Sequence, residues 1–320
     1  RIIFDALEGA AGREATSRLN TVALRNVSLQ PRVLVNVEDR KLGKTFLGNY
    51  WDLPFGVAPM GMGNLFWPGT DDSLATVSRE KNIPLGVSTM GSSKLEDIFS
   101  AAEGNAWFQL YVGESRELTD DLVDRAKYTG YDVLILTADV PVLTPRLRDL
   151  RNGFTVPFRM GPRQILDFSL HPNWSLQTLC NGVPKPVNVT SVHDQRLSST
   201  DQEGFRRESG RGKIDWEFFS DLREKWPRKL ILKGVMSPED ARIAVSRGSD
   251  AVYVSNHGGR QLDSAPPAIH ALPLIREAVG PNYPLLFDSG ICNGDSVIKA
   301  LALGANFVML GRPFLYALGA

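Results

Sequence analysis

Eight short apolar runs, each separated from the next by a segment with helical periodicity, constrain this chain more than any other feature of its sequence. The runs are almost continuously apolar, which is typical of parallel strands that are covered on both faces. We expect strands at 54–58, 83–88, 106–111, 132–137, 229–233, 250–255, 284–288 and 306–310. Amphipathic patterns between the runs predict helices at 71–81, 116–128, 237–247 and 294–303.

Strands that alternate with helices form either a closed barrel or an open, doubly wound sheet. A dinucleotide-binding sheet needs G-x-G-x-x-G after its first strand, and the sequence A-P-M-G-M-G-N at 58–64 does not fit that pattern. The count of eight favours an α/β fold of the TIM-barrel type, (β/α)8, and 320 residues are enough for one such barrel with insertions. We therefore expect a single domain over 1–320.

The segment between the fourth and fifth strands is several times longer than one helix requires, so the sequence predicts a long insertion there. Its residues 155–214 are rich in Pro, Ser, Asn and Arg. Loops of this length are usually functional or disordered. The sequence leaves three interpretations open: a lid over the site, a surface that docks a partner, or a mobile surface loop.

The composition argues against several classes of protein. Lys and Arg number 36, as do Asp and Glu, and a net charge of zero gives no overall sign of nucleic-acid binding. No apolar run approaches the length of a membrane span, and no metal site is predicted. Two cysteines, Cys180 and Cys292, are too few for a disulfide framework, so we expect a cytoplasmic location. The chain starts without Met, and we expect both natural ends to be missing.

The ends of the predicted strands carry polar groups and glycines. In a barrel of this type, catalytic residues lie at the carboxyl ends of the strands. Glycine-rich turns after the seventh and eighth strands, followed by Arg312, are typical of a phosphate site at a helix N-terminus. The run S-N-H-G-G-R-Q-L-D at 255–263 places His257, which exchanges protons near neutral pH, three residues before Arg260, which pairs with carboxylates. The sequence therefore predicts a ligand site with a base and a phosphate group.

Several motifs in a fixed order resemble the FMN-dependent L-2-hydroxy acid dehydrogenases and oxidases, a family that includes glycolate oxidase, lactate oxidase, flavocytochrome b2 and mandelate dehydrogenase. They are F-Q-L-Y at 108–111, L-T-A-D-V at 136–140, L-K-G-V at 232–235, S-N-H-G-G-R-Q-L-D at 255–263 and K-A-L-A-L-G-A at 299–305 followed by G-R-P at 311–313. The resemblance covers all of the chain except 155–214. It implies FMN as the cofactor and a small 2-hydroxy acid as the substrate.

The resemblance also implies a role for each residue of the site. His257 is the base, Asp139 pairs with its imidazolium, Tyr111 hydrogen-bonds the substrate or the developing oxyanion, and Lys233 stabilises the reduced flavin. The substrate carboxylate is held by Arg146 and Arg260. The implied cofactor-binding residues, from the flavin ring to the phosphate, are Met60, Gly61, Ser88, Gln109, Thr137, Lys233, Ser255, Asp288, Ser289, Gly290, Cys292, Gly311 and Arg312.

Three positions depart from the family's pattern. Ala6 stands where the family commonly has a Tyr, Met90 where it has a bulky aromatic residue, and Cys292 where it has an Arg near the phosphate. The first two changes predict room for medium or bulky substrates. If the departures have abolished turnover, the chain is instead a non-catalytic FMN-binding barrel.

The resemblance further implies an external electron acceptor and a homo-oligomer, a tetramer in the family. Gly61 stands where oxidases often carry Ala and where mandelate dehydrogenase carries Gly. This favours a quinone or a cytochrome over O2 as the acceptor, and it is compatible with a peripheral position at the inner face of a membrane. The sequence does not distinguish hydride transfer from a carbanion route.

Overall fold

Eight parallel strands close into a barrel in the computed structural model, which describes residues 1–113, 115–142, 144–154, 160–190 and 214–319. Each strand pairs with its neighbours in chain order, and β10 pairs with β3 to complete the ring. The strands are β3 (Phe55–Met60), β4 (Leu85–Ser88), β5 (Ala106–Leu110), β6 (Val133–Thr137), β7 (Lys229–Val235), β8 (Ala251–Val254), β9 (Leu285–Phe287) and β10 (Phe307–Leu310). The predicted (β/α)8 fold and all eight predicted strands are confirmed.

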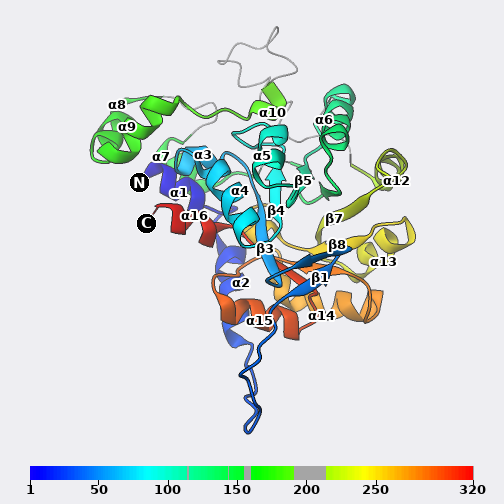
Figure 1. Ribbon diagram of the computed structural model, residues 1–320. Coiled ribbons are helices and arrows are strands. Elements are labelled where there is room, and N and C mark those ends of the chain that lie inside the picture. The colour runs from blue at the N-terminus through cyan, green and yellow to red at the C-terminus, as the bar shows by residue number, and fades with distance from the viewer. Residues whose placement is uncertain (114, 143, 155–159, 191–213, 320) are drawn as a thin grey trace.

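Helices surround the barrel (Figure 1). The outer layer contains α4 (Thr70–Glu80), α5 (Leu95–Ala101), α6 (Arg116–Thr129), α12 (Trp216–Lys225), α13 (Pro238–Ser246), α14 (Ala268–Val279), α15 (Gly294–Ala302) and α16 (Arg312–Gly319). The four predicted helices correspond to α4, α6, α13 and α15. At the start of α13, the Ser237 hydroxyl accepts hydrogen bonds from Glu239 N at 3.1 Å and Asp240 N at 3.4 Å, so it satisfies two of the helix's free N–H groups.

Strand side chains alternate between the barrel interior and the helical layer, which produces two apolar clusters. A hairpin of β1 (Lys44–Phe46) and β2 (Asn49–Trp51) closes the amino-terminal end of the barrel. Its Phe46 ring stacks on Phe307 with centroids 5.1 Å apart, and Trp51 meets Trp107 edge-on at 5.9 Å. This end is therefore packed with aromatic rings, and the carboxyl-terminal end is left to carry the polar groups.

Two segments lie outside the barrel: the N-terminal segment and the insertion after β6. The N-terminal helices α1 (Ile2–Glu8) and α2 (Ala15–Asn26) pack beside the strand ends, whereas the following arm, residues 27–43, extends away from the body (Figure 1). The insertion after β6 starts with α7 (Leu147–Asn152). Within the range predicted as a loop excursion the structure describes α8 (Pro162–Ser169), α9 (Pro172–Asn181) and α10 (Val187–Thr190), while 155–159 and 191–213 lie outside the described residues.

Two hydrogen-bonded side chains attach the insertion to loops at the carboxyl ends of strands. Trp174 Nε1 on α9 donates to Phe66 O at 3.1 Å, at the end of α3 (Gly63–Phe66), which follows β3. Asn188 on α10 is fully buried, and it accepts from Leu95 N at 2.9 Å and donates to Ser93 O at 3.1 Å in the loop after β4. The insertion therefore packs on the end of the barrel where the polar residues lie.

We expect Gly234→Ala to destabilise the fold more than a glycine substitution at an open turn. Gly234 lies at a register irregularity of β7, has φ +100°, and an added Cβ would lie 2.6 Å from Asp139 Cβ. Gly280→Ala is the matched control, because Gly280 has φ +85° and nothing lies within 4 Å of its added Cβ. Overpacking typically costs about 1–3 kcal/mol, so urea denaturation should show a loss of unfolding free energy larger by that amount in Gly234→Ala. Equal losses in the two variants would contradict this account.

Candidate functional site

The predicted catalytic residues meet at the carboxyl-terminal end of the barrel. His257 Nδ1 lies 3.0 Å from Asp139 Oδ1, and its Nε2 lies 3.2 Å from the Tyr111 hydroxyl. Since a carboxylate accepts hydrogen bonds, Asp139 places the imidazole proton on Nδ1 and leaves Nε2 with a free lone pair. The three side chains come from loops after β8, β6 and β5, which only closure of the barrel brings together.

Local backbone geometry fixes the direction of the imidazole. His257 opens the short helical turn η1 (His257–Gly259) with φ +58°, a left-handed conformation that is rare outside glycine. Its backbone N–H donates to the Ser255 hydroxyl at 3.0 Å. Gly258 follows with φ +64°, and Gly259 packs so closely on α2 that an added Cβ would lie 2.4 Å from Ser17 N. The two adjacent glycines are therefore required by this turn and by its contact with α2.

The environment keeps His257 neutral and Asp139 ionised at neutral pH. Burial lowers the pKa of His257, and the opposing charge of Asp139 only partly restores it, so the net shift is downward. Burial alone would raise the pKa of Asp139, but its interaction with the His257 imidazole, which includes a hydrogen bond, and the charge of Lys233 outweigh burial and lower the pKa. The pair thus combines an uncharged base with a negative group that stabilises the base once it is protonated.

Lys233 is a buried cation between two carboxylates. Its Nζ lies 3.9 Å from Asp139 Oδ2 and 3.8 Å from Asp288 Oδ2, and it donates to the Ser255 hydroxyl at 3.1 Å. The Ser289 hydroxyl donates to Asp288 Oδ1 at 2.8 Å, which fixes the second carboxylate. Asp139 Oδ2 is buried without a hydrogen-bond partner among the described residues, so the Lys233 charge is its main compensation.

An uncharged hydrogen-bonded row crosses the floor of the site. The Ser88 hydroxyl donates to Gln109 Oε1 at 2.9 Å, and Gln109 Nε2 donates to Thr137 Oγ1 at 2.9 Å. All three side chains are buried at the ends of adjacent strands. The row offers donors and acceptors without charge, as the edge of a heteroaromatic ring requires.

Three arginines surround the rest of the site. Burial, followed by the charges of Arg146 and Arg312, lowers the pKa of Arg260 to about 9. Arg260 Nη1 donates to Leu7 O at 2.8 Å and Gly9 O at 2.5 Å, at the end of α1. A guanidinium has five donors, and Arg260 Nε has no hydrogen-bond partner in the described part of the chain, while Nη2 donates only to Ala6 O at 3.3 Å. Mutual repulsion of three cations makes this region a site for anions.

The predicted phosphate end lies beside the first turn of α16. Arg312 Nη2 lies 3.4 Å from Gly258 O, and a Cβ added to Gly258 would lie 3.1 Å from the same nitrogen. Glycine therefore leaves open a space beside the guanidinium that any other residue would fill. Together with the N–H groups of α16's first turn, this arrangement fits the phosphate of FMN; the neutral floor and Lys233 fit its ring system.

Cys292 is a predicted site residue that lies outside the cluster. Its side chain is exposed, and its Sγ contacts Gly290 O at 3.4 Å. Gly61 lies against Met90, since an added Cβ would come within 2.8 Å of Met90 Cβ. Ala6 is buried, and its carbonyl accepts from Arg260 Nη2 at 3.3 Å, which places this departure beside an arginine of the site.

Sequence reasoning missed an amide pair that holds the His257 turn. Asn20 and Asn256 each donate from Nδ2 to the other's Oδ1 at 2.8 Å, and both are buried. Asn20 Oδ1 also accepts from Ala268 N at 3.1 Å. No local pattern marks Asn20, because its partner is 236 positions away.

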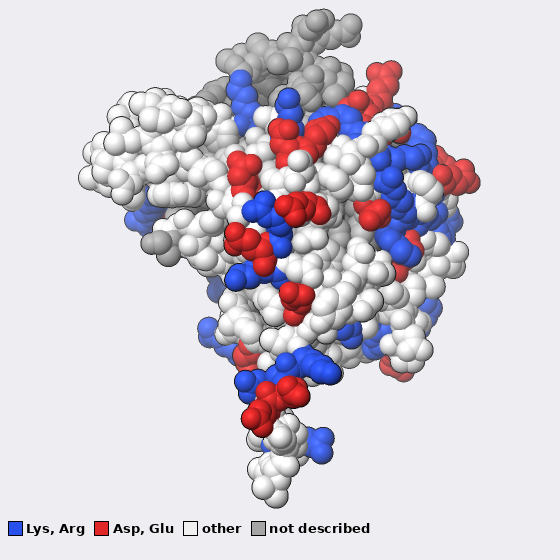
Figure 2. All heavy atoms as spheres, in the orientation of Figure 1, with Lys and Arg blue, Asp and Glu red and all other residues white. Residues whose placement is uncertain are grey.

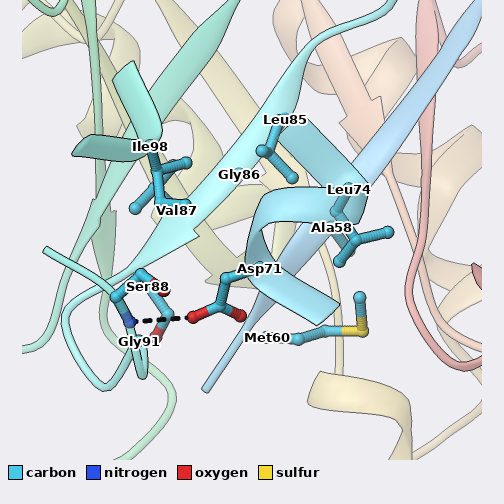
Figure 3. A pocket seen from close by; sticks show the side chains of 11 residues that line it. Ala58, Met60, Asp71, Leu74, Leu85, Gly86, Val87, Ser88, Gly91 and Ile98 are labelled. Carbon is cyan, nitrogen blue, oxygen red and sulfur yellow. Dashed lines mark hydrogen bonds between the residues drawn. The ribbon is translucent and has the colours of Figure 1, made fainter. Parts of the chain in front are cut away.

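A buried acid that was also missed supports the other side of the site (Figure 3). Asp71 Oδ2 accepts from Ser92 N and Ser93 N at 2.9 Å each, so it fixes the loop that carries Met90. Burial raises the pKa of Asp71 to about 6 despite these bonds. It lines a cavity of about 20 Å³, enough for one water molecule, between β3 and β4.

Comparisons with known proteins agree with this geometry. Residues 1–320 match the family model described as FMN-dependent dehydrogenase. The chain is 38% identical to (S)-mandelate dehydrogenase of Pseudomonas putida, covering 100% of this chain and 80% of that protein. It is 36% identical to L-lactate dehydrogenase of Pseudomonas syringae pv. syringae (strain B728a), covering 100% of this chain and 84% of the relative.

Solved structures show the same similarity. The crystal structure of the monotopic membrane protein (S)-mandelate dehydrogenase superposes with a TM-score of 0.92 at 37% identity, covering 99% of this chain and 84% of that one. A mandelate oxidase variant with (S)-mandelic acid gives a TM-score of 0.82 at 33% identity, covering 99% of this chain and 82% of the other.

Proposed function

We propose that this chain, which belongs to the FMN-dependent dehydrogenase family, oxidises an L-2-hydroxy acid to the 2-oxo acid. The observation that carries the proposal is the imidazole of His257 held between Asp139 and Tyr111, close to partly buried arginines. A protein that only binds FMN needs an anion site for the phosphate, but it needs neither an oriented base nor further arginines beside that base. The relatives named for mandelate and lactate give the substrate class.

The arginines hold the carboxylate of the substrate. Arg260 keeps its Nε edge for a bidentate contact while α1 fixes the rest of its guanidinium. Arg146 adds a second cation, and Asp149, 4.0 Å from its Nη1, balances it only weakly. Binding an anion therefore relieves repulsion that the free site contains.

His257 takes the hydroxyl proton of the substrate on Nε2, and Tyr111 hydrogen-bonds the oxygen from which it leaves. FMN, when bound, accepts the two electrons and the hydrogen that the α-carbon loses. Asp139 would stabilise the imidazolium, and Lys233 would supply a positive charge beside the bound flavin. A carbanion route would use the same base on the C–H bond.

The cofactor is held by the residues that follow the strands. Ser88, Gln109 and Thr137 would hold the flavin ring, together with the backbone of Met60 and Gly61. The ribityl chain and phosphate would be held by Ser255, Asp288, Ser289, Gly290, Gly311 and Arg312, whereas the exposed side chain of Cys292 lies outside this set.

The substrate is a 2-hydroxy acid of medium or large size, because Ala6 and Met90 stand where the family commonly has bulkier aromatic residues. Ala6 leaves out the aromatic ring and hydroxyl that a Tyr would place near Arg260, and Met90 is flexible and only partly buried.

Anaerobic mixing with a panel of L-2-hydroxy acids tests the whole proposal. Bleaching of the flavin absorbance supports an enzyme, with larger acids at least as effective as glycolate. A yellow protein that none of the acids reduces would instead support the non-catalytic FMN-binding barrel.

We expect His257→Ala to keep FMN but to slow its reduction by at least about 10²–10⁴-fold, the usual loss for a general base. His270→Ala, on the exposed surface of α14, is the matched control. In the native protein the reduction rate should rise with pH through a pKa below that of free histidine, because the base acts when neutral and its pKa is lowered. Stopped-flow absorbance measures both effects, and reduction of His257→Ala within a few-fold of native would remove His257 from this role.

The electrons leave to a quinone or a cytochrome rather than to O2. Gly61 resembles the residue of mandelate dehydrogenase at this place. Its close contact with Met90 shows that packing also requires glycine at this position.

We expect the reduced enzyme to react faster with a quinone analogue than with air-saturated buffer. Double-mixing stopped flow gives both rates on one preparation. Gly61→Ala should speed the oxygen reaction, and Met90→Ala is a control for the displacement of Met90 that the new methyl group causes. Faster reoxidation of the native enzyme by O2 than by the quinone would overturn the choice of acceptor.

The insertion after β6 brings the protein to the surface of a membrane. Its described part carries exposed apolar side chains at Met160, Ile165, Leu166, Leu170, Leu176, Leu179 and Val183. Figure 2 shows few charged side chains over the α8–α9 lobe, in contrast to the rest of this face. An exposed apolar patch of this kind is typical of an interaction site, and the similarity to a structure described as a monotopic membrane protein supports a membrane as the partner. No helix in the described ranges is long and apolar enough to cross a bilayer.

We expect Leu170→Asp and Leu179→Asp to weaken sedimentation with anionic vesicles by about tenfold or more each, since burial of one Leu side chain contributes about 1.5–3 kcal/mol. Leu274→Asp is the matched control, because Leu274 is an exposed leucine of α14, which lies away from the α8–α9 lobe (Figure 1). Equal binding by all three variants and the native protein would show that this lobe does not contact the lipid.

The arm at 27–43 supports the predicted homo-oligomer. Val33 and Leu34 on it are almost fully exposed, and apolar side chains on an extended segment are buried only against another molecule. We propose that this other molecule is a second copy of the chain. The family resemblance implies that the assembly is a tetramer.

A further inference from the structure

A tyrosine lies deep inside the barrel, directly beneath the charged residues of the site. Tyr253 on β8 is fully buried in the apolar interior cluster with Ile135, Ile231 and Leu286. Its hydroxyl has no hydrogen-bond partner among the described residues. Phenylalanine would fill this place without burying an unpaired polar group, so the hydroxyl calls for a function.

The strand register places Tyr253 between the buried lysine and one of its carboxylates. On one side it pairs with Lys233 of β7, and on the other with Leu286 of β9. Since side chains alternate along a strand, Asp288 is the next residue after Leu286 that faces the interior. Tyr253 is thus flanked by a cation and an anion that lie 3.8 Å apart.

The face of the Tyr253 ring contacts the ammonium of Lys233. Nζ lies 5.2 Å from the ring centroid, within the range of a cation–π interaction. Nζ donates a hydrogen bond to Ser255, while both carboxylate oxygens near it lie beyond hydrogen-bond distance. The pKa of Tyr253 is raised well above its ordinary value, first by burial and then by the charge of Asp288. The phenol therefore remains a donor that faces a carboxylate.

We propose that Tyr253 is a positioning residue that keeps the Lys233 ammonium from closing onto Asp288, and so leaves its charge available to the reduced flavin. The ring attracts Nζ, and the dipole of the uncharged hydroxyl stabilises the charge of Asp288 electrostatically, in place of the ammonium. Without Tyr253 the lysine and the aspartate pair more tightly, and their charges cancel. The inference rests on the proposed place of Lys233 beside the flavin.

The test is the two-electron reduction potential of the FMN-loaded protein, measured by equilibration with a reference dye. Tyr253→Leu removes ring and hydroxyl, and we expect it to shift the reduction equilibrium about tenfold toward oxidised flavin, which is about 30 mV. Tyr253→Phe keeps the ring, and we expect a shift of about threefold. Both shifts should vanish in a Lys233→Met background, because the effect acts through the ammonium.

A purely structural role predicts the opposite pattern. Removal of an unpaired hydroxyl would then leave the potential of Tyr253→Phe within error of native, and this result overturns the proposal even if Tyr253→Leu does not fold. Shifts of full size in the Lys233→Met background overturn it as well. No hydroxy acid enters the measurement, so loss of the shift and failure of the proposed reaction are separate results.

Discussion

The rest of the site depends on a buried layer of charge across the carboxyl-terminal end of the barrel. One ammonium, Lys233, lies within 4 Å of two carboxylates, Asp139 and Asp288, and one of them also holds His257. Burial of such groups is costly unless each is paired and hydrogen-bonded. Ser255 accepts a hydrogen bond from Lys233, and Ser289 donates one to Asp288. This need for hydrogen bonds explains why polar residues stand at the ends of strands whose interior residues are otherwise apolar.

Segments far from these residues in sequence hold the layer from outside. The end of α1 binds Arg260 through its carbonyl groups, and Asn20 of α2 holds Asn256 beside the His257 turn. The N-terminal helices therefore belong to the site although they carry none of its chemistry. On the opposite side, Asp71 fixes the loop after β4 by two backbone hydrogen bonds.

The sequence predicted what depends on local pattern. Apolar runs located all eight strands, and the polar residues at their ends identified groups that the barrel brings together, such as His257, Asp139 and Tyr111. Contacts between residues far apart in the sequence left no such signal. No motif or spacing in the sequence predicts the hydrogen bonds from Arg260 to the end of α1 or the Asn20–Asn256 pair. The helices of the insertion were missed because Pro, Ser and Asn masked the apolar side chains that α8 and α9 expose.

The insertion connects the outer surface to the cofactor side of the barrel. Trp174 hydrogen-bonds the end of α3, which follows Met60 and Gly61, and Asn188 binds the loop that follows Met90. The surface that we propose to meet lipid, on α8 and α9, is thus attached to the two loops that carry Met60, Gly61 and Met90. In the proposed arrangement a quinone dissolved in the bilayer would approach at this same end of the barrel, so the insertion would serve both the membrane contact and the transfer of electrons.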